Sequence, residues 1–249
     1  MSRINIMGVP VDALTMDQTV QKIMSHIEKG KPFQHMAINP AKVIRMMEDS
    51  HVREGIRRCE VISVDGVGFY FASHFLGKPL PERVTGIDLM DNLLKEASVR
   101  GLRPYFLGAQ EEVLQKAMAH YQQKFPTLEF AGFRNGYFTP EEEEGIAKSI
   151  GEAKADMLFV AISSPKKEQF LAKWRDTINI PFCMGVGGSF DVIAGKVKRA
   201  PKILQKLGLE WTYRWKQEPK RMLRRNMVDT PKFVALVVIN KLTGLEVPQ

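Results

Sequence analysis

Val61-Ile62-Ser63-Val64-Asp65-Gly66-Val67-Gly68 contains a short apolar run, an acidic residue and two glycines, and a second apolar segment follows it. This pattern predicts a buried strand that turns into a helix at Asp65. In an open α/β sheet, ligands bind at the carboxyl ends of the strands. Asp65 is therefore a candidate general base. The alternative is that its carboxylate only caps the following helix.

Strands and helices alternate along most of the chain. The segment 32–38 predicts a strand, and Asn39-Pro40 after it suits an N-cap and a first helical position. Further strands are expected at 104–107, 128–132, 157–162 and 180–184, with helices between them. This spacing is typical of βαβ units and predicts an α/β fold with a mostly parallel sheet covered by helices on both faces.

Glycines follow three of the predicted strands. Gly108 follows one, Gly136 lies just after the next, and Gly187 belongs to a cluster that follows the last. Glycine allows a ligand to approach the backbone closely, and the N-termini of the next helices can face phosphate. The pattern is typical of a nucleotide pocket. There is no G-x-G-x-x-G in the first unit and no Walker A motif, which disfavours a standard dinucleotide or P-loop site.

Composition and charge narrow the class of protein. The chain has 249 residues, 44% of them hydrophobic, and its two cysteines are far apart, so neither a disulfide framework nor a zinc site is expected. Neither a signal peptide nor a run of about 18 apolar residues is present. A cytoplasmic protein, soluble or peripheral on a membrane, is expected.

The basic residues concentrate at the C-terminus. Residues 196–249 hold 13 of the 36 Lys and Arg residues but only 4 of the 28 Asp and Glu residues. We therefore expect a catalytic α/β domain at 1–195 and a basic amphipathic helical appendage at 196–249. Aromatic and aliphatic residues lie among the cations, as in a helix that binds an anionic membrane surface. The alternative is a helix that packs on the core and has a solvated basic face.

Ten short motifs occur in order along the chain. They are Ile38-Asn39-Pro40, Val64-Asp65-Gly66-Val67-Gly68, Glu82-Arg83-Val84-Thr85-Gly86-Ile87-Asp88-Leu89, Phe106-Leu107-Gly108, Gly136-Tyr137-Phe138, Ser164-Pro165-Lys166-Lys167-Glu168, Gly185-Val186-Gly187-Gly188-Ser189-Phe190-Asp191, Arg199-Ala200-Pro201, Gly208-Leu209-Glu210-Trp211 and Tyr213-Arg214. In this order and spacing they resemble the WecG/TagA/CpsF family of bacterial glycosyltransferases over nearly the whole chain.

The resemblance implies a fold and an activity. The fold is Rossmann-like, of the type called GT-E, with a basic helical appendage. The activity is an inverting, metal-independent transfer from a UDP-sugar, carrying N-acetylmannosamine, a uronic acid or a related sugar, to an undecaprenyl-diphosphate-linked saccharide. The reaction belongs to cell-surface polymer synthesis and takes place on the inner face of the cell membrane. No cofactor is implied beyond the UDP-sugar, which is the donor substrate.

The resemblance also implies roles for single residues. Asp65 matches the general base. The substrate-binding positions are Asn39, Arg83, Gly108, Gly136, Tyr137, Lys167, Gly187, Asp191, Arg214, Arg221 and Arg224. Tyr137 and Asp191 are expected near the nucleotide, and the three appendage arginines near the diphosphate. By composition alone, Arg83 lies in a loop, where most arginines are solvated.

The chain departs from the family pattern where the donor sugar would be handled. Family members usually carry Gly-x-Pro-Lys-Gln-Glu, whereas Ser163 stands near the glycine position here and Lys167 replaces the glutamine. Ala37 stands where a threonine is common. Lys167 either pairs with a carboxylate, as a uronic-acid donor would offer, or points to solvent.

The charge on the leaving diphosphate needs a counter-charge. Many glycosyltransferases use a metal held by Asp-x-Asp, but this motif is absent and the five histidines lack metal-ligand spacing. Arginines can replace the metal because a guanidinium binds phosphate bidentately. No metal site is predicted.

Two other functions remain open at this point. A non-enzymatic protein could bind nucleic acid through the basic tail, although no nucleic-acid motif is present and the tail contains a long apolar run. A nucleotide-sugar epimerase or dehydrogenase is disfavoured by the missing dinucleotide motif. The donor sugar and the oligomeric state, a homo-oligomer included, are left open.

Overall fold

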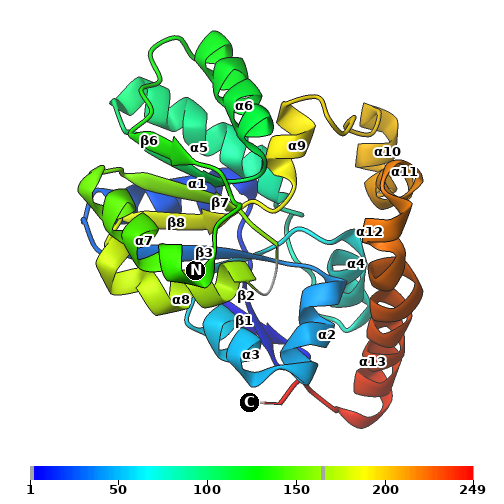
Figure 1. Cartoon of the computed structure of the whole chain (residues 1–249). Coiled ribbons are helices and arrows are strands. Elements are labelled where there is room, and N and C mark those ends of the chain that lie inside the picture. The colour runs from blue at the N-terminus through cyan, green and yellow to red at the C-terminus, as the bar shows by residue number, and fades with distance from the viewer. Residues whose placement is uncertain (1–2, 164–165, 249) are drawn as a thin grey trace.

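A single parallel sheet forms the centre of the molecule (Figure 1). The computed structural model describes residues 3–163 and 166–248. The six strands lie in the order β4-β3-β8-β7-β5-β6, and every neighbouring pair is parallel. Their bounds are β3 Phe33–Ile38, β4 Val61–Val64, β5 Pro104–Gly108, β6 Gly132–Arg134, β7 Met157–Ala161 and β8 Phe182–Gly185. The expected α/β class with a parallel sheet is confirmed.

Helices cover both faces of the sheet (Figure 1). One face packs against α1 (Met16–Ile27), α5 (Gly86–Arg100), α6 (Glu111–Lys124) and α9 (Ser189–Ile193). The other packs against α2 (Pro40–Glu48), α3 (Ser50–Arg57), α4 (Val67–Phe75), α7 (Glu143–Glu152, after the 3-10 turn Pro140–Glu142) and α8 (Lys166–Ile178). The neighbouring strands β3 and β8 thus lead into helices on opposite faces, and in open α/β sheets ligands bind outside the carboxyl ends of such a strand pair.

An N-terminal hairpin extends the second face. β1 (Arg3–Ile6) and β2 (Val9–Asp12) pair antiparallel. The buried Asp12 carboxylate accepts hydrogen bonds from the Ile62 N–H (2.8 Å) and from Arg3 (3.0 Å), which attaches the hairpin to β4. Burial raises the pKa of Asp12, but these hydrogen bonds and that from Lys22 outweigh it and hold the pKa below its usual value.

The strand expected at 128–132 begins later than predicted. In the structure β6 starts at Gly132 and pairs with β5 from Tyr105 onward. Leu128 is buried, but its N–H donates to the Phe125 carbonyl in a turn (3.0 Å). Its apolar character therefore reflects core packing from a turn and not strand structure.

The C-terminal segment forms a chain of helices along one side of the molecule, beside α4 and α2 (Figure 1). Its elements are α10 (Lys202–Lys206), α11 (Glu210–Gln217), α12 (Pro219–Arg224), the π-helical turn η2 (Arg225–Asp229) and α13 (Thr230–Thr243). Phe233, Leu236 and Val237 of α13 are buried in the same core as β3 and β4. The last helix thus packs on the body of the protein, and the boundary expected at residue 196 stays a prediction.

Candidate active site

Asp65 and Asn39 lie side by side because they follow neighbouring parallel strands. The pairing of Ile38 with Val64 brings the ends of β3 and β4 level, and the Asp65 N–H donates to the Ile38 carbonyl (2.9 Å). A Cβ at Gly66 would lie 2.6 Å from Pro40 Cδ and 2.9 Å from Asn39 Cα. Only glycine permits this approach of the two strand ends.

The Asp65 carboxylate does not cap the helix that follows it. The N-cap of α4 is Gly66, with no side-chain cap, so the alternative in which Asp65 caps this helix is wrong. Its half-buried side chain makes no hydrogen bond or ion pair with the residues that the structure describes. Asn39 does cap: its Oδ1 accepts from the Lys42 N–H (3.0 Å) at the start of α2. The Asn39 amide is thus used in capping, whereas the Asp65 carboxylate remains available to a substrate hydroxyl.

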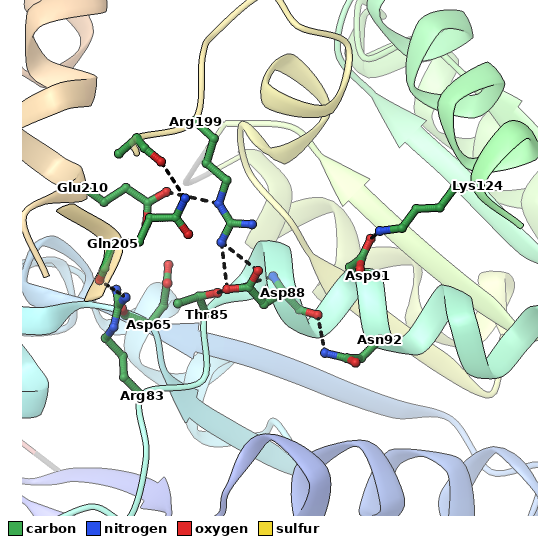
Figure 2. A network of polar contacts seen from close by, with 11 residues as sticks. Asp65, Arg83, Thr85, Asp88, Asp91, Asn92, Lys124, Arg199, Gln205 and Glu210 are labelled. Carbon is green, nitrogen blue, oxygen red and sulfur yellow. Dashed lines mark hydrogen bonds and ion pairs between the residues drawn. The ribbon is translucent and has the colours of Figure 1, made fainter. Parts of the chain in front are cut away.

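Arg83 connects Asp65 to the appendage. Its Nη1 donates to the Asp65 carbonyl oxygen (3.3 Å) and its Nη2 to the Gln205 carbonyl oxygen at the end of α10 (3.4 Å). Figure 2 shows Arg83 beside Asp65 and below Gln205. The composition-based expectation of a solvated loop arginine is wrong, because two long-range carbonyl contacts hold this half-buried side chain.

Lys167 is buried beneath the end of β8. Its Nζ lies 3.1 Å from Glu168 Oε1, and a Cβ at Gly185 would meet this ammonium at 2.8 Å. The alternative that placed Lys167 in solvent is therefore wrong. Its charge pairs within the chain, and a carboxylate on the donor is not needed to explain it.

Lys42 adds a second ammonium to this region. Its Nζ donates to the Ala37 carbonyl oxygen (2.8 Å). Burial, together with the nearby charge of Lys167, lowers the pKa of Lys42 to about 8. Ser164 and Pro165, in the same motif as Lys167, lie outside the described residues.

The glycine-bearing strand ends form the other side of the site. Gly108 has φ +126°, and a Cβ there would lie 2.5 Å from the Ala161 carbonyl. The Gly136 N–H donates to the Ala109 carbonyl (2.9 Å), so the ends of β5 and β6 meet. The Tyr137 side chain beside them is 69% exposed. This surface offers backbone and an aromatic ring to a ligand.

The turn after β8 lies along the same edge. Gly187 adopts φ +54° as the chain turns into α9, where Asp191 is half-buried. Asp191 Oδ1 lies 3.8 Å from Lys196 Nζ. The structure thus places Gly108, Gly136 and Gly187 at the carboxyl edge of one sheet, as their spacing predicts.

The appendage arginines differ in where they point. Arg214 donates to Glu218 (3.0 Å) one turn along α11. Arg224 is exposed and lies 3.4 Å from Glu48, at the far end of α2 from Asn39. The Arg221 side chain lies outside what the structure describes. A role of these arginines at a diphosphate stays a prediction, and for Arg224 the observed contact with Glu48 argues against it.

Arg225 is a cation that the sequence interpretation missed. It lies with Met222 and Asp229 on the inner face of the α12–η2 segment, and its half-buried side chain makes no hydrogen bond or ion pair with the described residues. Desolvation lowers the pKa of Arg225, the charges of Asp65 and Asp229 raise it, and the charge of Arg214 lowers it. An unpaired, desolvated guanidinium near Asp65 is suited to bind an anion.

The π turn explains why Arg225 was missed. The Thr230 N–H bonds to the Arg225 carbonyl, five residues back, just before Pro231, which has no N–H to donate. The extra residue in this turn shifts the helical phase. Two adjacent arginines were visible in the sequence, but which of them faces inward depends on this shift.

Arg199 fastens the appendage to α5. Its Nη2 lies 2.7 and 2.8 Å from the two Asp88 carboxylate oxygens, and its Nε lies 3.6 Å from Glu210 on α11 (Figure 2). Thr85 caps α5 and also donates to Asp88 (2.5 Å). The motif from Arg83 to Asp88 thus holds the appendage at two points, through Gln205 and through Arg199.

Comparisons with known proteins identify the family of the chain. A family model described as "Glycosyl transferase WecG/TagA/CpsF family" matches residues 4–246. The chain belongs to this family.

Two similar proteins from different bacteria have the same enzyme name. An "N-acetylglucosaminyldiphosphoundecaprenol N-acetyl-beta-D-mannosaminyltransferase" of Bacillus spizizenii is 33% identical over 235 residues, covering 92% of this chain and 90% of its own. A protein of the same name from Staphylococcus aureus (strain MW2) is 36% identical over 225 residues, covering 90% of this chain and 88% of its own. As a WecG/TagA/CpsF member, the chain is a glycosyltransferase, and the nucleic-acid-binding and epimerase alternatives no longer stand.

The contact between Arg199 and Asp88 predicts a loss of activity when it is broken. We expect Arg199→Ala in this glycosyltransferase to lower kcat/KM about fivefold, because an ion pair worth about 1 kcal/mol no longer holds the appendage over the site. Combining Asp88→Arg with Arg199→Asp should restore part of the loss. Arg100→Ala, which breaks the ion pair with Glu28 (2.9 Å) at the far end of α5, is the matched control. An equal loss in the control would contradict the positioning role.

The opposite orientations of two adjacent arginines predict unequal effects. Arg225→Ala should weaken UDP binding at least about tenfold, since a charge-assisted hydrogen bond contributes about 1.5–3 kcal/mol. Arg224→Ala, one residue away in the same helix, should change it less than about threefold. Calorimetric titration with UDP measures both. Equal losses would show that both arginines reach the nucleotide.

Proposed function

We propose that this WecG/TagA/CpsF glycosyltransferase transfers N-acetylmannosamine from a UDP-sugar to N-acetylglucosamine linked to undecaprenyl diphosphate, in bacterial cell-surface polymer synthesis. The names of its relatives, which align over about nine-tenths of both chains, support the two substrates. One observation carries the site assignment: the Asp65 carboxylate lies at the carboxyl edge of the sheet with no hydrogen bond or ion pair to the described residues, while Arg83 contacts the Asp65 carbonyl oxygen and the charge of Asp65 acts on Arg225.

The proposed reaction is an inverting displacement. Asp65 accepts the proton of the acceptor hydroxyl while that oxygen forms a bond to the anomeric carbon of the donor sugar. The bond from this carbon to the UDP oxygen breaks on the opposite side, and UDP leaves with both bonding electrons. Arg225, with Arg214 nearby, faces the growing negative charge on the diphosphate. No metal is part of this scheme.

The donor lies over the glycine-bearing strand ends in this proposal. Gly108, Gly136 and Gly187 allow the nucleotide to approach the backbone. Tyr137 offers a ring for the base and Asp191 a carboxylate for the ribose. Asn39 and the buried Lys167–Glu168 pair lie on the side of the donor sugar. The uronic-acid donor is the less supported reading, because Glu168 already pairs with Lys167.

The fold and the appendage fit the same proposal. We assign the sheet to the GT-E type and treat residues 196–249 as the unit that closes over the site. The contacts of Arg83 with Gln205 and of Arg199 with Asp88 support this role. In the proposed arrangement the enzyme is cytoplasmic and peripheral on the inner face of the cell membrane.

An exposed apolar surface supports the membrane location. We call it the outer face; it comprises Leu223, Met227, Val228, Val234, Val238, Ile239 and Leu242. Lys232 and Lys241 lie on the same helix, α13, whose inner side chains are already in the core. Apolar side chains thus lie on two sides of α13, one side in the core and one exposed, and an exposed apolar patch marks a site of interaction with a partner or a membrane. None of the helices among the described residues combines the length and apolar composition needed to cross a bilayer.

The role of Asp65 predicts a selective loss. Asp65→Asn should lower kcat by a factor of about 100 to 10,000, because general base catalysis contributes about that much. UDP affinity should stay within about threefold. Transfer is measured by mass spectrometry of the lipid-linked product, and Asp176→Asn, an exposed change on α8, is the control. Wild-type turnover by Asp65→Asn would remove Asp65 from the mechanism.

A chelator should leave wild-type turnover unchanged, because no metal is part of the proposed reaction.

The outer face predicts binding to anionic vesicles. Wild-type protein should float with vesicles containing phosphatidylglycerol, and less so at high salt because surface charges are screened. Leu242→Asp should reduce flotation by about tenfold or more, as one buried leucine contributes about 1.5–3 kcal/mol. Val99→Asp is the matched control, since Val99 and Leu242 are both 78% exposed. Equal flotation of both variants would place the membrane contact elsewhere.

A further inference from the structure

A groove opens between α4 and the turn that joins α10 to α11. Its volume is about 260 Å³. It is lined by Val67, Tyr70, Phe71, Pro81, Glu82, Arg83, Leu207 and Gly208. None of these residues except Arg83 belongs to the site described above. The groove lies on the α4 side of Asp65, and the strand ends proposed for the donor lie on the other side.

Asp65 does not line the groove, but two residues that do line it, Val67 and Arg83, lie close to Asp65. Val67 is two residues after Asp65 and begins α4. Arg83 lines the groove and donates to the Asp65 carbonyl oxygen (3.3 Å). A molecule that contacts Arg83 in this groove would therefore have one end on the Asp65 side of the groove.

The groove is charged at the end formed by Arg83 and apolar at the end open to solvent. Arg83 supplies a positive charge inside, whereas Phe71 and Leu207 are 61% and 60% exposed. Glu82 also lines the groove, and its carboxylate accepts from the Met16 N–H (2.8 Å), which orients it toward the start of α1. The groove is thus suited to a ligand with an anionic head and an apolar tail.

The appendage forms one wall of the groove, and Gly208 allows this wall to lie close to α4. Gly208 adopts φ +71°, and a Cβ there would lie 2.3 Å from Val67 Cγ2. Glycine at this turn therefore lets α10 close on α4. The contact of Arg83 with the Gln205 carbonyl oxygen holds the same turn from inside (3.4 Å). The groove exists only while the appendage is docked.

We propose that this groove binds the lipid-linked acceptor, with the diphosphate at Arg83 and the first prenyl units between Phe71 and Leu207. The proposal rests on the proposed function, in which the acceptor is a polyprenyl-diphosphate-linked sugar. The sugar then lies toward Asp65 and the chain leaves toward solvent or a membrane. Sites that enclose a whole small ligand have volumes of about 300–1,000 Å³. A groove of about 260 Å³ fits one segment of a long prenyl chain.

Acceptors that differ only in the lipid provide the test. The ratio of kcat/KM for a farnesyl-diphosphate-linked N-acetylglucosamine to that for the methyl-diphosphate analogue measures the contribution of the prenyl chain, and no membrane is needed. Leu207→Asp and Phe71→Asp should each lower this ratio about tenfold, since about two buried methylene groups account for that factor. Ile203→Asp is the matched control, because Ile203 lies on α10, is 72% exposed and does not line the groove.

Two results would overturn the groove. The first is an unchanged ratio in Leu207→Asp and Phe71→Asp, and the second is an equal fall in Ile203→Asp. UDP affinity of each variant shows whether it is folded. Binding of farnesyl diphosphate alone, measured by calorimetry, tests the groove even without transfer: it should weaken in Leu207→Asp and not in Ile203→Asp. If wild type binds farnesyl diphosphate but transfers to neither acceptor, the proposed function fails and the groove stands.

Discussion

The close contact of Gly66 with Asn39 and Pro40 determines the geometry of this site. A side chain at Gly66 would collide with both residues, at 2.9 and 2.6 Å. The contact keeps the turns after β3 and β4 together and leaves the N-cap of α4 to a glycine. Asp65 is consequently released from capping, and its carboxylate stays available. Because Gly66 occupies the N-cap of α4, the carboxylate of Asp65, one residue earlier, is available to a ligand.

The remaining parts of the site are arranged around that carboxylate by the parallel sheet. All six strands run in one direction, so the turns that follow them gather at one edge. Donor-side features follow β5, β6 and β8, and Asp65 follows β4. The proposed acceptor groove lies beyond Asp65 along α4. The proposed base thus lies between the two proposed binding regions, which suits an inverting transfer, because attack and departure take place on opposite sides of one carbon.

The appendage supplies what the sheet does not. Parallel strand ends offer backbone groups and few cations, so neutralising a departing diphosphate needs charge from elsewhere. Arg225 brings such a charge to the inner face of the α12–η2 segment, and Arg199 and Arg83 hold the appendage in place. The same helices carry apolar side chains on their outer face. In the proposed function, one segment therefore serves both binding to a membrane and completion of the site.

The sequence by itself determined the α/β class, the parallel sheet, and Asp65 and the glycines at strand ends, because apolar runs, turn residues and their spacing are local properties. The start of β6 was misplaced, since the apolar Leu128 packs into the core from a turn. Only the tertiary structure decided the roles that depend on contacts between distant segments. It placed Lys167 under Gly185 beside Glu168, turned Arg224 toward Glu48, and placed the half-buried Arg225 on the inner face of the α12–η2 segment. A cation's partner is set by packing across the fold and by the phase of a helix, and neither can be read from a run of residues.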